Sequence, residues 1–289
     1  MDLEFIKDLC KKINLSPEAC DTALRVLLTE EKAIRRAQKH AGLTHLHIPY
    51  RRLRKNRADG AAFCLGFALA EAERAFGRYK QLGIPEAIYY DTMQDISVWV
   101  NTCAREEGIV GLCELSWIRH ALYLNLFQIG RLQYQFFKTN HTVSGIPAGL
   151  CAKVPIGSRQ PALNIHIPEG GRLDFSACQQ SLQEARVFFW QYFPQYKYAG
   201  FVCDSWLLDR HNAQFMREDS NILQFASLFD CVVQTRFENN ELLRRLWGIH
   251  KASREELALL PEDTDLQKRA KQYLLNGGKT GSGYGFIIK

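Results

Sequence analysis

Apolar residues recur at spacings of three and four over roughly the first 128 residues, which predicts a series of amphipathic helices. Ser16 followed by Pro17 predicts a helix start, because serine can cap the first turn and proline fits its first position. Gly83 and Pro85 likewise predict the end of one helix and the beginning of the next. We therefore expect an all-helical N-terminal domain over residues 1–120.

Beyond this point the apolar period shortens to two, which is typical of strands with one polar face. IGRLQYQFF, residues 129–137, is predicted to be one strand, and residues 139–161 a long loop. Further strands are expected at 162–168, 199–207, 231–237 and 284–288, and helices near 176–193, 220–229, 241–247 and 264–275. The strand–helix–strand unit over 162–207 predicts a parallel strand pair with a right-handed crossover. Residues 121–289 should therefore form an α/β domain.

The segment EGGRLDFSAC, residues 169–178, stands between the first strand of that unit and its helix. Its two glycines would let backbone N–H groups converge on an anion, Arg172 would add a fork of donors, and Asp174 and Ser176 are candidate helix caps. The same residues are also compatible with an ordinary turn, and both interpretations stay open. A nucleotide triphosphate or dinucleotide is disfavoured, since neither GxGxxG nor a Walker lysine is present.

Charge is unevenly distributed, because residues 32–57 hold nine Lys and Arg residues and no acid. Such a cluster can meet RNA, a membrane surface or a polyphosphate, or it can be a solvated face partly paired with acids from elsewhere. No RNP-like strand, helix-turn-helix signature or zinc knuckle accompanies it, so nucleic-acid binding is disfavoured. No apolar run is long enough to cross a membrane.

The nine cysteines are odd in number and form no CxxC pair, so we expect buried free thiols, with Cys203 packed in a core strand. His45 and His47 lack a third ligand, and no metal site is expected. The charged first twenty residues do not resemble a signal or transit peptide, which favours a cytoplasmic protein.

LNIHIPEGGRL, CDSWLLD, SNILQF and LPEDTDLQKRAKQYLLNGG together resemble a known family. They are similar to bacterial acyltransferase-domain proteins that join a helical N-acyltransferase N-terminal domain to a GNAT-like C-terminal domain. The resemblance implies an α/β (α+β) fold, all-helical over 1–120 and GNAT-like with a mixed sheet over 121–289. It also implies an acyl-CoA-dependent acyltransferase, with CoA or acyl-CoA between the strands 162–168 and 199–207. The turn 169–173 departs from the Gln/Arg-x-x-Gly-x-Gly/Ala loop of typical GNAT enzymes.

The resemblance further implies where the chemistry takes place. The candidate catalytic residues are His166, as a general base, and Asp204 and Ser205, which point to opposite faces of a strand unless a bulge intervenes. The expected contacts to CoA are Ile167, Gly170, Gly171, Arg172, Ser176 and Asn221. The acceptor would be a small-molecule or peptide amine. Two alternatives stay open: a silent acyl-CoA-binding module, and a nucleic-acid-associated protein that uses residues 32–57.

Overall fold

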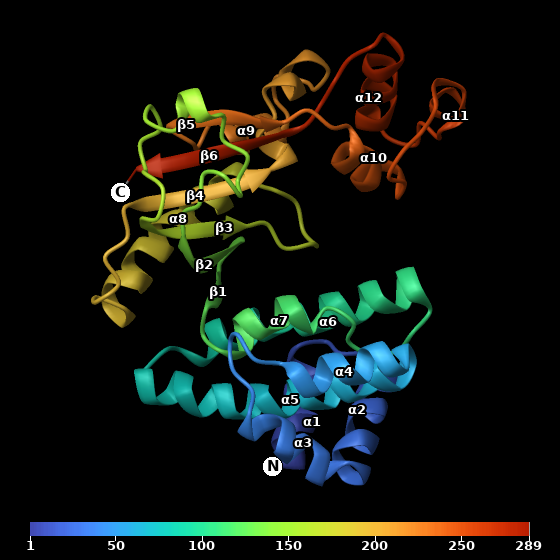
Figure 1. Ribbon diagram of the computed structural model, residues 1–289, viewed down its shortest axis with the longest axis vertical. Coiled ribbons are helices and arrows are strands. Elements are labelled where there is room, and N and C mark those ends of the chain that lie inside the picture. The colour runs from blue at the N-terminus through green and yellow to red at the C-terminus, as the bar shows by residue number, and fades with distance from the viewer. Residues whose placement is uncertain (289) are drawn as a thin grey trace. The chain divides into compact units, whose positions relative to one another are not determined.

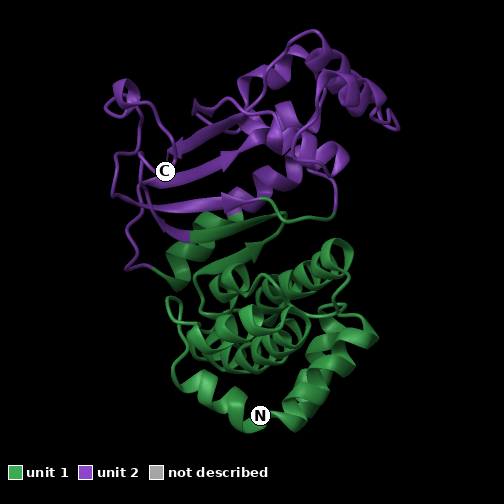
Figure 2. Ribbon diagram, turned by 45° about the vertical axis from the view of Figure 1, so that its right-hand side comes forward, with its two compact units in different colours: residues 1–135, 167–170, 184–193 green, residues 136–166, 171–183, 194–289 purple. Residues whose placement is uncertain are grey.

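The computed structural model describes residues 1–288, which fall into two compact units (Figures 1 and 2). Unit 1 comprises residues 1–135, 167–170 and 184–193. Unit 2 comprises residues 136–166, 171–183 and 194 onward. The chain therefore passes between the units several times, and one of these crossings falls within the predicted corner, between Gly170 and Gly171.

Seven helices form most of unit 1, which confirms the expected helical N-terminal region. They are α1 (Leu3–Lys12), α2 (Pro17–Thr29), α3 (Glu31–Lys39), α4 (His47–Lys55), α5 (Arg57–Leu82), α6 (Glu86–Glu107) and α7 (Leu115–Leu122).

The predicted helix boundaries have the expected local causes. The hydroxyl of Ser16 accepts a hydrogen bond of 3.3 Å from the backbone N–H of Ala19 and so caps α2. Gly83 ends α5 at φ 69°, a left-handed conformation that glycine adopts without strain. Gly60 lets α4 and α5 approach closely, because a Cβ atom there would lie 2.5 Å from the backbone of Leu53. Most of the middle of α5 is buried, so this helix forms the centre of the bundle.

A six-stranded mixed sheet follows, in the order β1-β2-β3-β4-β6-β5. The strands are β1 (Leu126–Ile129), β2 (Leu132–Lys138), β3 (Pro161–His166), β4 (Gly200–Ser205), β5 (Cys231–Arg236) and β6 (Ser282–Ile288). Strands β3 and β4 are parallel, whereas β1–β2, β4–β6 and β5–β6 are antiparallel pairs. Helix α8 (Phe175–Tyr192) connects β3 to β4, and the predicted strand–helix–strand unit is thereby confirmed.

The predicted single strand over 129–137 is wrong, because the segment is part of a hairpin. Ile129 pairs with Leu132, and Gly130 turns the chain between them at φ 59°. The preceding helix ends at Leu122, and Leu124 adopts φ 53° before the new strand begins. The short apolar run around Phe127 fits a helix or a strand equally well, so its pattern alone does not locate the boundary.

The last part of unit 2 holds four further helices. They are α9 (Asn221–Ala226), α10 (Asn240–Trp247), α11 (Arg254–Leu259) and α12 (Asp265–Leu275). The sequence analysis missed α11, which is six residues long and mostly exposed, so its apolar pattern is too short to detect. Helices α11 and α12 each begin with a reciprocal capping box, formed by Ser253 with Glu256 and by Thr264 with Gln267.

The expectation of free thiols is wrong for two of the nine cysteines. Cys103, in the last turn of α6, forms a disulfide with Cys113, in the segment before α7. Their Cα atoms lie 6.0 Å apart, within the usual range for a disulfide, although ten residues separate them along the chain. Cys203 is buried in β4 as expected, and burial raises the pKa of its thiol.

Over residues 1–288, none of the helices has both the length and the apolar character that a bilayer crossing requires.

Candidate active site at the carboxyl ends of β3 and β4

Strands β3 and β4 stop pairing before they end. Over the described residues their ladder consists of Leu163 opposite Phe201 and Asn164 opposite Val202. By contrast, β4 pairs with β6 along its whole length, from Gly200 to Ser205. Beyond the Asn164–Val202 pair, β3 continues to His166 and β4 to Ser205. Ligands of open α/β sheets bind at such carboxyl ends, so this is the first place to look for a site.

His166 is the last residue of β3 and is half-buried. Asn164 lies on the same strand face, and its Nδ2 atom is 3.2 Å from Nε2 of the imidazole. An amide nitrogen can only donate, so in this contact Nε2 accepts and the proton of a neutral ring sits on Nδ1. An imidazole whose Nε2 accepts can act as a general base once this contact is exchanged for the amine.

The strand register brings His166 and Asp204 to one face of the sheet. Asn164 pairs with Val202, and the residues two positions further along each strand point the same way as that pair. Asp204 is held by an ion pair with Arg236, with 3.4 Å between Oδ2 and Nη2. Burial raises the pKa of the Asp204 carboxyl, and the nearby guanidinium opposes this effect.

Ser205 lies on the opposite face, because β4 pairs with β6 through Ser205 without a bulge. Its hydroxyl accepts a hydrogen bond of 3.2 Å from the backbone N–H of Leu207 and caps the short 3₁₀ turn η2 (Trp206–Leu208). The alternation expected from the sequence is thus confirmed, and the sheet does not bring Ser205 to the face of His166 and Asp204.

The predicted corner has the backbone geometry that glycine permits. Gly170 and Gly171 adopt φ 91° and 71°, and open space surrounds the position of a Cβ atom at both. The carboxylate of Asp174 caps α8 and accepts hydrogen bonds from the backbone N–H of Ala177 at 2.9 Å and from the hydroxyl of Ser176 at 2.6 Å. The negative charge at this helix start would repel a phosphate, which leaves the N–H groups of 170–173 and Arg172 to bind one.

Two further predicted CoA contacts lie at ends of elements. Ile167 directly follows β3, and the neighbouring carbonyl of Pro168 accepts a hydrogen bond of 3.3 Å from Arg131 within unit 1. Asn221 is the first residue of α9, where the hydroxyl of Ser220 accepts from the backbone N–H of Ile222. These positions do not test the predicted CoA contacts, which stay predictions.

Unit 1 contains a buried carboxyl that the sequence analysis missed. Asp95, on α6, accepts a hydrogen bond of 2.5 Å from the indole N–H of Trp117. Burial raises the pKa of Asp95 to about 6, while hydrogen bonds from Trp117 and Gln133 act in the opposite direction. Burial also lowers the pKa of His120, whose ring contacts Trp117, to about 4. The apolar spacing along α6 predicts that Asp95 lies on a buried face. It does not identify the hydrogen-bond partners of Asp95, because these come from α7 and β2.

Replacing Asp95 with asparagine is expected to change how stability depends on pH. A folded-state pKa raised from 3.8 to about 6 means that the native protein binds the proton more tightly than the unfolded chain. Asp95 therefore destabilises the fold increasingly as pH rises through this window, whereas asparagine does not titrate. Urea unfolding should show the variant gaining stability relative to the parent, on the order of 1–2 kcal/mol, between about pH 4.5 and pH 7. A stability difference that does not change with pH would contradict the assigned pKa.

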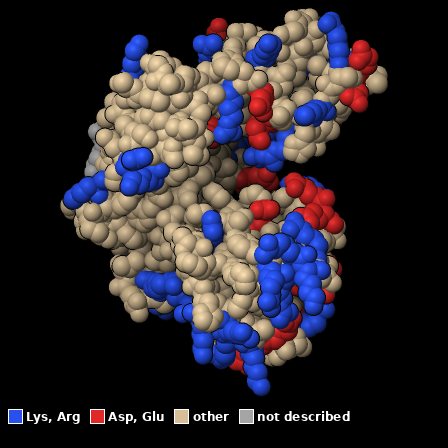
Figure 3. Space-filling view, in the orientation of Figure 1, with Lys and Arg blue, Asp and Glu red and all other residues tan. Residues whose placement is uncertain are grey.

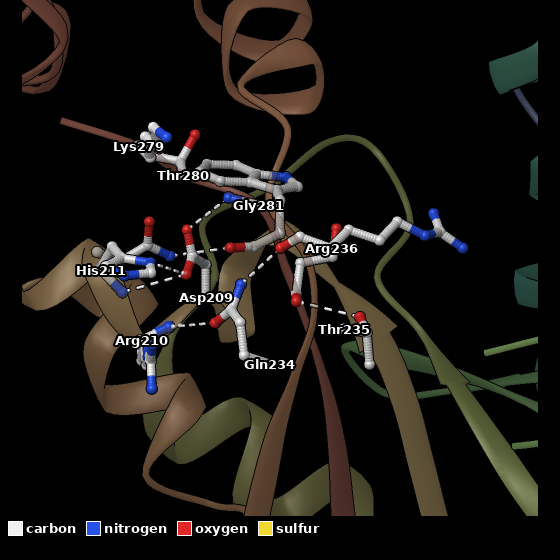
Figure 4. A network of polar contacts seen from close by, with 12 residues as sticks. Asp209, Arg210, His211, Gln234, Thr235, Arg236, Lys279, Thr280 and Gly281 are labelled. Atoms are coloured by element: carbon white, nitrogen blue, oxygen red, sulfur yellow. Dashed lines mark hydrogen bonds and ion pairs between the residues drawn. The ribbon is translucent and has the colours of Figure 1, made fainter. Parts of the chain in front are cut away.

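Unit 2 also contains a buried carboxylate, Asp209, which forms an Asp–His pair with His211 (Figure 4). Asp209 accepts from Nδ1 of His211 at 2.8 Å and from the backbone N–H groups of His211 and Gly281 at 3.1 and 2.6 Å. The network continues through Gln234, which accepts from the N–H of Arg210 and donates to the carbonyl of Arg236. Asp209 thus ties the chain after β4 to the start of β6. Asp209, but not His211, lines an apolar groove of about 680 Å³ along β5, and the hydrogen-bonded Asp209–His211 pair is an alternative acid–base pair to His166.

One group of metal-ligating side chains occurs over residues 1–288, and its members already have partners. It consists of Cys103, Cys113 and Glu107. The two cysteines form the disulfide, and Glu107 is ion-paired with Arg57.

Two family models match the chain. The model described as the GNAT-like C-terminal domain matches residues 126–287, and the N-acyltransferase N-terminal domain matches residues 4–124. No curated protein matches significantly.

Several solved structures share the fold at 21% sequence identity. An acyltransferase in complex with decanoyl-CoA and teicoplanin has a TM-score of 0.74, over 99% of this chain and 88% of its own. A mutant acyltransferase in complex with octanoyl-CoA has a TM-score of 0.72 over the same shares. An acyltransferase in complex with decanoyl-CoA has a TM-score of 0.70, over 98% of this chain and 86% of its own.

Proposed function

The chain belongs to the GNAT-like C-terminal domain family, and we propose that it is an acyl-CoA-dependent acyltransferase that transfers the acyl group directly to an amine. The observation that carries this proposal is the end of the β3–β4 ladder, beyond which His166 and Asp204 share a face. Acyl-CoA is the cosubstrate. The acceptor is a small molecule or peptide, and the teicoplanin complex of a similar fold supports a peptide-type amine.

In this mechanism His166 acts as the general base. The amine nitrogen attacks the thioester carbonyl carbon, the C–N bond forms, and the C–S bond then breaks. The amine displaces the amide of Asn164 from Nε2 of His166 and passes its proton there, and the imidazolium then returns a proton to the departing thiolate, so that CoA leaves as the free thiol. Asp204 supports the imidazolium that forms, because a carboxylate on the same face favours the charged ring. Ser205, the third candidate, lies on the opposite face and takes no step in this mechanism.

The CoA moiety lies along the carboxyl ends of β3 and β4 in this proposal. Pantetheine, which carries amides, hydrogen-bonds to the backbone of the strand ends beyond the Asn164–Val202 pair. Gly170, Gly171 and Arg172 bind the pyrophosphate, and Ile167, Ser176 and Asn221 complete the contacts. We retain the division into residues 1–120 and 121–289 as part of the proposal.

Turnover tests the function directly. Purified protein is mixed with acetyl-, octanoyl- or decanoyl-CoA and a panel of amine and peptide acceptors, and free thiol is followed with time. Thiol release that depends on the acceptor, together with an acylated product of the expected mass, supports the proposal. Tight binding of acyl-CoA without thiol release from any acceptor would instead favour a silent acyl-CoA-binding module.

CoA is expected to stabilise the folded chain. A ligand present at 100 times its Kd and bound only by the native state adds about 2.7 kcal/mol. For a protein of this size that corresponds to a rise in Tm of roughly 5–10 °C, measured by scanning calorimetry. An unchanged Tm at millimolar CoA, with no heat of binding by titration calorimetry, would be incompatible with an acyl-CoA site.

A further inference from the structure

The basic segment 32–57 surrounds a hollow in unit 1 whose lining includes none of the residues proposed for acyl transfer. Helices α3 and α4 and the loop between them enclose about 330 Å³. Six cationic or imidazole side chains line the hollow: Arg36, His40, His45, His47, Arg51 and Arg52. Within residues 1–288 no carboxylate contributes to its lining. Lys and Arg side chains gather on this part of the surface, over α4 (Figure 3).

Two of these arginines have no acidic partner. Arg52 is ion-paired with Glu30, and Arg35, outside the lining, is ion-paired with Glu31. Arg36, on α3, and Arg51, on α4, form no ion pair or side-chain hydrogen bond with any residue in 1–288. Two guanidinium groups from different helices therefore border one hollow with their donors unused by the protein.

The backbone at the hollow also carries partial positive charge, like the side chains that line it. Helix α4 begins at His47, and the preceding residue, Leu46, has no side-chain group to cap it. Leu46, His47 and Ile48 all line the hollow. The first N–H groups of a helix have no intrahelical acceptor and carry partial positive charge, which adds to the charge of the arginines.

We propose that this hollow binds the phosphate end of a small phosphorylated ligand, at a site of its own in the helical unit. Guanidinium forks match phosphate oxygens in pairs, imidazole N–H groups add further donors, and the uncapped helix start supplies backbone N–H groups. The hollow of about 330 Å³ has room for a diphosphate-sized group. The lining has no Phe, Tyr or Trp on which bases could stack, so a single-stranded nucleic acid fits it poorly.

The test is titration calorimetry of the full chain with inorganic pyrophosphate at fixed ionic strength. Saturable binding at one site is expected. The double variant Arg36→Ala, Arg51→Ala should raise Kd by about 100-fold, at roughly tenfold for each lost charge-assisted bond. The matched control is Arg54→Ala, Lys55→Ala, which removes the same charge from α4 outside the lining. This control should stay within about threefold of the parent, because neither residue lines the hollow and charges that do not contact the ligand are screened.

Three results would overturn the proposal. If pyrophosphate does not bind at millimolar concentration, the proposed site does not exist. If both double variants lose the same affinity for pyrophosphate, the anion binds a diffuse basic surface and not a specific pocket. Displacement of pyrophosphate by 3′,5′-ADP, with a KM for octanoyl-CoA raised in Arg36→Ala, Arg51→Ala, assigns the hollow to the cosubstrate. Pyrophosphate binding that is unaffected by saturating CoA supports a separate phosphate ligand, whether or not acyl transfer itself is confirmed.

Discussion

Replacing His166 with alanine is expected to lower kcat for acyl transfer by about 10²–10⁴-fold, the range typical of a lost general base. The Kd for octanoyl-CoA should stay within a few-fold of the parent, because the imidazole acts on the amine and not on CoA. Loss of kcat with retained binding marks an interaction made in the transition state. The measurement combines acceptor-dependent thiol release with titration calorimetry on the same protein.

His211 provides the matched control for this prediction. Its Nδ1 donates to the buried carboxylate of Asp209, so His211→Ala leaves that carboxylate short of a partner. Its free energy of unfolding should fall by about 1–3 kcal/mol, while kcat stays within a few-fold. The reverse pattern, with His211→Ala inactive and His166→Ala active, would assign the chemistry to the Asp209–His211 pair and reject His166 as the base.

Replacing Arg172 with alanine is expected to raise the Kd for CoA about 10- to 150-fold, because a charge-assisted hydrogen bond to the pyrophosphate contributes about 1.5–3 kcal/mol. Dephospho-CoA retains the pyrophosphate and should lose as much affinity, whereas pantetheine lacks it and should bind both proteins equally. Lys197→Ala removes the same charge from an exposed position of unit 2 and serves as the control.

Gly171 supplies an independent test of the corner. Asparagine tolerates the left-handed backbone at φ 71°, so Gly171→Asn should fold, and its side chain would occupy the open space through which a phosphate must approach. Its affinity for CoA should fall at least tenfold if the N–H groups of 170–173 bind the pyrophosphate. Unchanged CoA affinity in both folded variants, Arg172→Ala and Gly171→Asn, would make this corner a structural turn only.

The sequence predicts well those features that depend on neighbouring residues. Ser16 with Pro17 starts α2, Gly83 ends α5, and the apolar alternation of β3 and β4 around α8 leads to a parallel pair. Each of these signals arises within a few residues, where side-chain spacing and turn chemistry decide the backbone conformation. The opposite directions of Asp204 and Ser205 follow from the same local alternation.

Features that depend on tertiary register could not be predicted in this way. The shared face of His166 and Asp204 follows from the pairing of Asn164 with Val202, and no local pattern specifies which residues pair between distant strands. The sequence around Asp95 does not show its hydrogen-bond partner, because Trp117 lies on another helix, 22 residues further along the chain. Burial next to such partners determines the pKa, so this candidate group emerges only from the folded chain.

A crystal structure of the protein with decanoyl-CoA bound tests the central claim most directly. The account predicts pantetheine between the carboxyl ends of β3 and β4, hydrogen-bonded to the backbone beyond the Asn164–Val202 pair, with the thioester on the face of His166 and Asp204. Decanoyl-CoA bound elsewhere, such as in the apolar groove along β5, with no density between β3 and β4, would contradict it.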